Sequence, residues 1–343
     1  MSHISWLTRT HRPTLRCALL AALLPLALAC GGSGKPAESP DEPPSLEDDS
    51  GEGGGAVAAS SPKVQEGIDA IQSGDFATAE MALAEARQEN PDDPQAAFYL
   101  GVAYEGLEDI KSAKKAYREA LELDPKLTEA SVNLSGVLLD VDQNPDSALK
   151  VVLQGLKHAP KHAGLLLNRA LVAEAQEDWT AAVDAWAKLV KQANDKLDWK
   201  LSYAMALHKA GNKGLALRQL SGAAKSKDLK ILAPAARMYG VLGAYKKCVK
   251  AFDRALEIKK LPELLVRRGL CRNASEDVKG AVQDLQEALN MDSKYAPAYL
   301  HLGIIFKQQE RTDEAKHNLE QAVANGEGTP IADQAKKELA DLK

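Results

Sequence analysis

The sequence is poor in aromatic residues, in cysteine and in excess positive charge. Its 343 residues include only 4 Phe, 4 Trp and 8 Tyr, which disfavours an all-β sandwich, because strands draw on aromatic and β-branched side chains. Four cysteines exclude a disulfide-dense miniprotein. The formal net charge of -5 leaves no surplus of Lys and Arg to neutralise phosphates, which argues against a nucleic-acid-binding protein. The residues that are abundant, alanine and leucine, favour packed helices.

The one pronounced apolar run is too short to cross a membrane. Residues 17–29 (CALLAALLPLALA) form a run of 13 residues, whereas a membrane-spanning helix needs about 20. Arg9, Arg12 and Arg16 precede this run, and no acidic residue lies among them. A basic start followed by a short apolar segment predicts an export signal over residues 1–29.

The end of the apolar run carries a recognisable processing site. Ala27-Leu28-Ala29-Cys30 is followed by glycine and serine, and it resembles a bacterial lipobox, which implies lipidation of Cys30 at the mature N-terminus. Gly31 is not the Asp that retains lipoproteins at the inner membrane of enteric bacteria. The resemblance therefore implies a location on the periplasmic face of the outer membrane. An ordinary signal-peptidase site also fits Ala27-x-Ala29, and it would release a soluble periplasmic protein.

Residues 30–62 lack apolar periodicity and are rich in Gly, Ser, Pro and acid. Such a segment buries too little surface to offset the entropy of ordering, so we expect a disordered acidic tether of roughly 30 Å. A second interpretation is that the acidic run is itself a docking tail. Residues 63–343 are close to neutral as a whole, so no global field is expected to steer a partner.

The rest of the chain repeats at intervals of 32–35 residues. Each unit contains two apolar-periodic segments that predict two amphipathic helices. The second segment of each unit carries a small residue, then a bulky one, then usually another small one. The first small position is occupied by Ala79, Ala113, Ala148, Ala182, Ala216, Cys248, Ala281 and Ala315. The bulky position is occupied by Leu83, Tyr117, Val152, Trp186, Leu220, Phe252, Leu285 and Leu319.

This pattern resembles the tetratricopeptide repeat, whose helices pair as helix-turn-helix units. The resemblance implies an all-α fold, a right-handed α-solenoid of about eight repeats over residues 63–328. Residues 329–343 are expected to form a capping helix over the last repeat. Its inner stripe is predicted to consist of Ile331, Ala335, Leu339 and Leu342.

A search for chemistry returns no phosphate loop, zinc-protease, redox or serine-hydrolase motif. We therefore expect no enzyme activity, no cofactor and no small-molecule substrate. His158 and His162 are four residues apart, but Pro160 lies between them in a predicted turn, so no metal site is expected. Cys248 and Cys271 fit small apolar packing positions, and a disulfide between them is also open because adjacent repeats touch.

The resemblance also implies a binding surface, because the first helix of each tetratricopeptide repeat lines a concave groove. Acids gather in repeats two to four and bases in repeats five and six, which suits an extended peptide or helix with a fixed direction. For the apolar members the alternative is packing between repeats. The predicted groove residues are Phe98, Val102, Glu105, Glu129, Val132, Asp140, Leu171, Glu174, His208, Lys209, Lys230, Arg237, Val266, Leu270, Asn273, Leu300, Ile304 and Lys307.

These features together resemble the pilotins of type IV pili and the repeat lipoproteins of gliding-motility and other envelope assemblies. The resemblance implies a non-catalytic scaffold that is lipid-anchored on the periplasmic side of the outer membrane. Its expected partners are other envelope proteins, as in motility, pilus or secretion machinery, and it is expected to touch the membrane only through the lipid. The alternative is an adaptor that docks peptidoglycan synthases or hydrolases.

Overall fold

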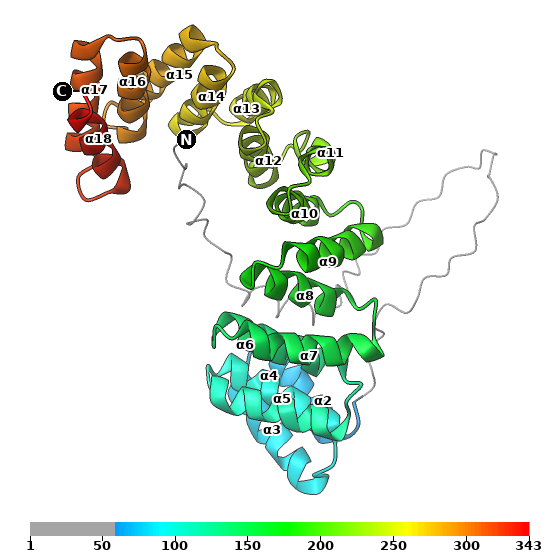
Figure 1. Cartoon of the computed structure of the whole chain (residues 1–343). Helices are drawn as coiled ribbons and strands as arrows, with labels where there is room; N and C mark the ends of the chain where they lie inside the picture. The colour runs from blue at the N-terminus through cyan, green and yellow to red at the C-terminus, as the bar shows by residue number, and fades with distance from the viewer. Residues whose placement is uncertain (1–58, 343) are drawn as a thin grey trace, which may run out of the picture. The chain divides into compact units, whose positions relative to one another are not determined.

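The computed structural model describes residues 59–342, and all regular structure in this range is helical. It contains seventeen helices and no strand (Figure 1). The predicted export signal, Cys30 and nearly all of the tether lie outside the described residues. None of the described helices has the length and apolar character needed to span a bilayer. The chain divides into two compact units, with the boundary between Val172 and Ala173.

The helices follow one another with short connections. Unit one contains α2 (Pro62–Ser73), α3 (Phe76–Glu89), α4 (Pro94–Gly106), α5 (Ile110–Leu123), α6 (Thr128–Asp140) and α7 (Pro145–His158). The boundary falls within α8 (Ala163–Ala175). Unit two contains α9 (Trp179–Gln192), α10 (Leu197–Lys209), α11 (Lys213–Ala223), α12 (Leu229–Val241), α13 (Tyr245–Ile258), α14 (Pro262–Ala274), α15 (Val278–Met291), α16 (Ala296–Gln308), α17 (Thr312–Asn325) and α18 (Pro330–Ala340).

Neighbouring helices pack in pairs, and each pair is one repeat. In unit one α2 packs on α3, α4 on α5 and α6 on α7; in unit two the pairs are α10 with α11, α12 with α13, α14 with α15 and α16 with α17. The second helix of a pair then packs on the first helix of the next, as α3 does on α4 and α13 on α14. This confirms the predicted all-α solenoid of tetratricopeptide type.

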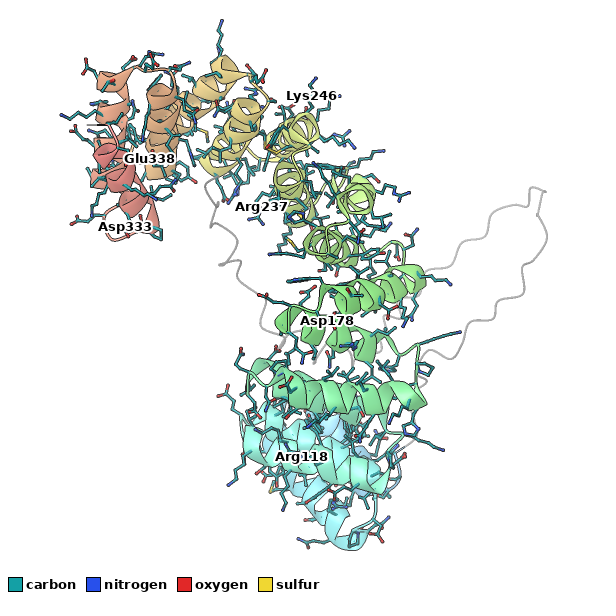
Figure 2. All side chains as sticks on the ribbon, viewed as in Figure 1. Arg118, Asp178, Arg237, Lys246, Asp333 and Glu338 are labelled. Atoms are coloured by element: carbon teal, nitrogen blue, oxygen red, sulfur yellow. A yellow bond between two sulfur atoms is a disulfide. The ribbon has the colours of Figure 1, made fainter. Side chains whose placement is uncertain are left out.

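The turn inside each repeat is built around one residue with left-handed backbone. A glycine takes this place three times and a glutamate four times; the residues concerned are Gly74, Glu108, Gln143, Glu177, Gly211, Gly243, Glu276 and Glu310. In several repeats the next residue is an aspartate whose carboxylate accepts a hydrogen bond from the backbone N–H three positions on, as Asp178 does from Ala181 at 3.0 Å (Figure 2). This side chain satisfies one of the free N–H groups at the start of the second helix.

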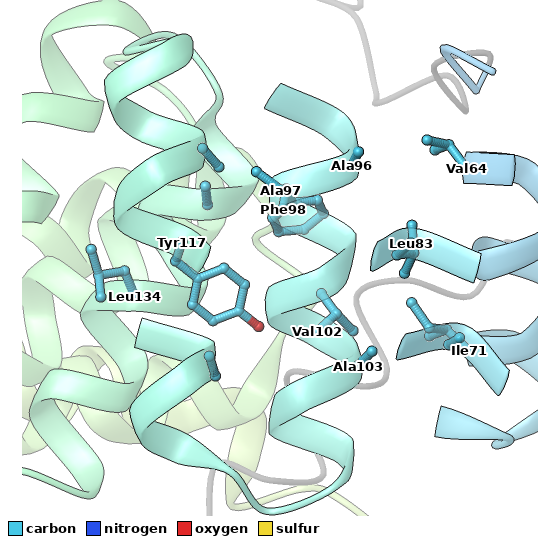
Figure 3. Close-up of a cluster of buried hydrophobic side chains, with 14 of the residues drawn as sticks. Val64, Ile71, Leu83, Ala96, Ala97, Phe98, Val102, Ala103, Tyr117 and Leu134 are labelled. Atoms are coloured by element: carbon cyan, nitrogen blue, oxygen red, sulfur yellow. The ribbon is translucent and has the colours of Figure 1, made fainter. Parts of the chain in front are cut away.

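The core is made by the repeated small and bulky positions. All eight residues at the first small position are fully buried, and the bulky residues are at most 2% exposed. In several repeats the bulky side chain lies against a glycine of the first helix: a Cβ at Gly67 would come within 2.4 Å of Leu83, and one at Gly101 within 2.6 Å of Tyr117. Leu83 and Tyr117 are part of the buried cluster in Figure 3. A side chain at either glycine would push the paired helices apart.

The folded part begins slightly earlier than residue 63, the start predicted from the sequence. The Ser61 hydroxyl caps α2 by accepting a hydrogen bond from the Val64 N–H at 3.2 Å. The Ser60 hydroxyl donates to the Asp93 carboxylate, and the Ser60 N–H donates to the Gln95 side chain at 2.9 Å. These hydrogen bonds fix residues that the periodicity alone assigned to the tether.

At the other end, α18 packs on both α16 and α17. Ala335 is fully buried beside Leu300 and Leu319, and Ile331 and Leu339 pack around them. The predicted inner stripe of the capping helix is therefore the face that contacts the last repeat. Its outer face carries exposed charged residues, such as Asp333 (Figure 2).

Candidate partner-binding surface

First helices of successive repeats pack on one another within each unit. In unit one α2 packs on α4, and in unit two α10 packs on α12, α12 on α14 and α14 on α16. The second helices α3, α5, α11, α13 and α15 each pack between their own first helix and the next one. The first helices therefore form one layer within each unit. We call the part of this layer that remains accessible the first-helix surface.

Four of the predicted groove residues do not belong to this surface. Phe98 is 3% exposed, Val102 and Val266 are each 5% exposed, and Leu300 is fully buried. The Phe98 ring centroid lies 5.9 Å from that of Tyr117. The expectation that these four residues are exposed anchors is therefore wrong, because they fill the contact between helices.

The other apolar residues of the predicted set keep some exposure. Val132 and Leu171 in unit one, and Ile304 in unit two, are half-buried. Leu270 on α14 is 37% exposed, the most exposed apolar member of the set. A large apolar side chain held on a packed helix can anchor a partner at modest entropic cost.

Two of the predicted acids already hold their own repeats together. The Tyr117 hydroxyl donates to Glu105 Oε2 at 2.8 Å, and Trp186 Nε1 donates to Glu174 Oε1 at 2.7 Å. In both repeats the acid lies on the first helix, and the buried ring lies twelve residues later on the second. Burial, reinforced by Glu105, raises the pKa of Tyr117 well above its ordinary value. These acids are structural groups as well as surface charges.

The remaining acids of the set, Glu129 and Asp140, are exposed in unit one. Glu129 lies in the first turn of α6 and Asp140 ends that helix. The two ends of α6 thus each carry an exposed acidic side chain.

Positive charge on the first-helix surface of unit two comes from several helices. Lys209 and Lys230 are exposed, and Arg237, which Figure 2 labels, is half-buried. Burial and the neighbouring guanidinium of Arg267 lower the pKa of Arg237. His208 on α10 and Asn273 on α14 are half-buried.

Lys307 forms an ion pair with the capping helix. Its Nζ lies 2.9 Å from Glu338 Oε2 on α18, so this predicted groove residue ties the capping helix to α16.

Arg267 and His301 stand 34 residues apart at equivalent places on α14 and α16. From the sequence His301 is interpreted as an ordinary groove or surface histidine, and its pairing with Arg267 is missed. Burial and then the charge of Arg267 lower the pKa of His301 to about 4. The regular spacing was the available signal. It was overlooked because the groove positions carried over from the repeat family did not include this place on the helix.

A buried polar group in unit one was missed for the same reason. Asn168 Nδ2 donates to the Val132 carbonyl and to the Ser135 hydroxyl, each at 2.8 Å. Asn133 Nδ2 donates to the Tyr117 hydroxyl at 3.2 Å. Asn133 and Asn168 again occupy equivalent places in successive repeats. Because buried polar groups are costly when unpaired, this group fixes the register of helices α5, α6 and α8.

The two cysteines of the folded part form a disulfide. Cys248 on α13 is bonded to Cys271 on α14, with a Cα–Cα distance of 6.1 Å. Of the two alternatives left open by the sequence, the structure has the disulfide. Within residues 59–342 no group of three or more His, Cys, Asp or Glu side chains is placed to hold a metal ion.

Comparison with sequence families identifies the repeats. Residues 64–128 and 134–198 match one description of the tetratricopeptide repeat, and residues 296–324 match a second. These ranges cover repeats one to four and repeat eight of the structure. The chain therefore contains tetratricopeptide repeats. No curated protein matches it.

Solved structures give matches of low identity. A tetratricopeptide repeat protein from Parabacteroides merdae is 19% identical with a TM-score of 0.48, over 67% of this chain and 92% of that one. PilF of Pseudomonas aeruginosa is 20% identical with a TM-score of 0.49, over 58% and 89%. Yeast Tom70 is 15% identical with a TM-score of 0.44, over 82% and 63%.

Proposed function

We propose that this protein is a non-catalytic scaffold that is lipid-anchored on the periplasmic side of the outer membrane and captures another envelope protein on its first-helix surface. The observation that supports this proposal best is the first-helix surface. Its packed helices present Glu129 in unit one and Lys230 and Leu270 in unit two. A lipid anchor together with a binding surface would hold a partner at the membrane, which suits an assembly role in motility, pilus or secretion machinery.

Two features support export. The basic and apolar start of the sequence ends at Cys30, followed by a Gly- and Ser-rich stretch, as lipidation requires. The Cys248–Cys271 disulfide fits an oxidising compartment, such as the periplasm, because cytosolic thiols are kept reduced.

The anchor is tested with Cys30→Ser. The wild-type protein should incorporate labelled fatty acid and fractionate with membranes. The variant should lose the label and move to the soluble periplasm. A wild-type protein without label, fractionating as the variant does, would show that processing occurs at an ordinary signal-peptidase site.

The binding surface is tested with Glu129→Lys in unit one and with Lys230→Glu and Leu270→Ser in unit two. All three residues are exposed, so each change should alter stability by less than about 0.5 kcal/mol. Glu105 and Glu174 are unsuitable because reversing them would break hydrogen bonds to Tyr117 and Trp186.

The measurement is recovery of co-purifying protein from a membrane extract, identified by mass spectrometry. The three variants should recover less of the wild-type partner. A matched control is Lys316→Glu, an exposed charge reversal on the second helix α17, which should recover as much as wild type. Equal recovery by all of them would place binding away from the first-helix surface.

A further inference from the structure

The near-neutral folded part conceals a strongly positive region. Residues 209–250 contain ten Lys and Arg but only one acidic residue, Asp228. Unit one has the opposite balance, with 11 basic and 18 acidic residues over residues 59–172. Positive charge is therefore concentrated in repeats five and six, which α10 to α13 form.

The turns inside these two repeats differ from those of repeats two, four and seven. In repeats two, four and seven the left-handed residue is a glutamate followed directly by an aspartate, as in Glu276-Asp277. Repeats five and six have Gly211 and Gly243 there instead, and Lys213 and Lys246 follow within three residues. The turns of repeats five and six are therefore basic, whereas those of repeats two, four and seven are acidic.

Exposed apolar side chains accompany this basic edge. Leu215 is 38% exposed, Val241 42% and Tyr245 37%. The two turns lie close together, since a Cβ at Gly243 would be 3.4 Å from Lys213 Nζ. We define the turn patch as Lys213, Leu215, Arg218, Val241, Tyr245 and Lys246.

The charges of the turn patch are free to meet a partner. Lys213, Arg218 and Lys246 are exposed, and none of them forms an ion pair within residues 59–342. Lys246 projects outward from the first turn of α13 (Figure 2). Such side chains can extend toward negative charge while their aliphatic stems cover apolar surface.

We propose that the turn patch binds the surface of a bilayer that contains anionic phospholipid. Unpaired basic side chains are attracted to anionic headgroups, and exposed Leu, Val and Tyr can enter the boundary between headgroups and acyl chains. This combination suits a bilayer because the lysines need no fixed hydrogen-bond geometry and the apolar side chains gain an apolar environment. The inference rests on the proposed function in one respect, that the anchor keeps the protein beside a bilayer. It adds a second membrane contact to the single lipid contact expected from the sequence.

The turn patch also leaves the first-helix surface accessible. The patch comes from the first half of α11, the start of α13 and the last residue of α12, whereas Lys230 lies at the opposite end of α12 and Leu270 lies on α14. A bilayer at the turns and a protein partner on the first helices would therefore not compete for the same residues.

The test uses the chain from residue 31 onward, which carries neither signal nor lipid. It is sedimented with vesicles of phosphatidylethanolamine alone and with vesicles that also contain phosphatidylglycerol. We expect binding only to the anionic vesicles, weakened by added salt. The triple variant Lys213→Glu, Arg218→Glu, Lys246→Glu should lose more than tenfold in vesicle affinity, since one basic residue near an anionic surface contributes roughly fivefold.

Two further variants separate charge from insertion. Leu215→Ser with Tyr245→Ser should weaken binding while its salt dependence persists. The matched control is Lys279→Glu, Lys294→Glu, Lys316→Glu, an equal change of charge at exposed positions elsewhere in unit two, and it should bind like wild type. Melting curves verify that each variant is folded.

The proposal is overturned if wild type binds both vesicle types equally or neither, or if the turn-patch and control variants bind alike. Sedimentation without vesicles would also overturn it, because the basic patch would then bind the acidic unit of a second copy. Failure here is distinct from failure of the scaffold role, since recovery of the protein partner by the turn-patch variants is measured separately.

Discussion

At Ala281 two helices meet with no room for a larger side chain. The residue is fully buried, and a Cβ added at Gly269 on the facing helix would lie 3.2 Å from the Ala281 carbonyl oxygen. We expect Ala281→Phe to lower the free energy of unfolding by about 1–3 kcal/mol or more, measured by urea denaturation. Gln283→Phe, at an exposed position of the same helix, is the control and should melt near wild type. Wild-type stability of the Ala281 variant would show that the repeat register is misplaced here.

His301 makes stability depend on pH. Its pKa of about 4 in the folded protein lies below the ordinary value of about 6.5 for an unfolded chain. Between these values the unfolded state binds more protons, so the free energy of unfolding should fall as pH drops from 6.5 toward 4, by up to about 1.4 kcal/mol per pH unit. The His301→Gln variant should show a shallower decline in denaturation at a series of pH values. Parallel curves for both proteins would contradict this role.

Among elements, α13 and α14 are joined covalently by the disulfide between Cys248 and Cys271, 23 residues apart. Closing a loop of this length restricts the unfolded chain and should stabilise the protein by about 3 kcal/mol. Adding reductant should therefore lower the melting temperature of wild type. The double variant Cys248→Ala, Cys271→Ala should melt lower and be insensitive to reductant. A reductant-insensitive wild type with free thiols by mass spectrometry would refute the disulfide.

The capping helix α18 protects the end of the last repeat. Removing residues 329–343 would expose Leu300 and Leu319, which Ala335 and its neighbours cover, and would release the Lys307–Glu338 ion pair. We expect a lower melting temperature and aggregation, because terminal repeats need a polar outer face. Deleting residues 31–58, which precede Ser60, is the control and should leave melting unchanged. Equal melting and solubility of both truncations would mean that α18 is not a cap.

For the whole molecule, a repeated local pattern made the architecture predictable. Every small and bulky position from Ala79 to Leu319 is buried as the register required, because one packing solution recurs in each repeat. The same register could not separate exposed from buried residues on the first helices. Phe98 and Leu270 both fall at predicted groove positions, yet only Leu270 is exposed, since the width of contact between successive first helices depends on the individual side chains.

Interactions between side chains were harder to predict than the register. The partners of Glu105 and Glu174, and the bond between Cys248 and Cys271, depend on distances between helices that spacing does not provide. The excess of bases in repeats five and six was visible in the sequence, but the exposure of Leu215, Val241 and Tyr245 beside them depends on the packing of the helices.

Whether the first helices bind a protein partner in the cell envelope is tested most directly by photo-crosslinking in cells that make the full-length protein. A photo-crosslinking amino acid is placed at Lys230 or Leu270 on first helices and at Gln283 or Lys316 on second helices. We expect one common protein adduct from the two first-helix positions and none of that mass from the two second-helix positions, all of which are exposed. Adducts confined to the second-helix positions, or no adduct at any of the four, would contradict it.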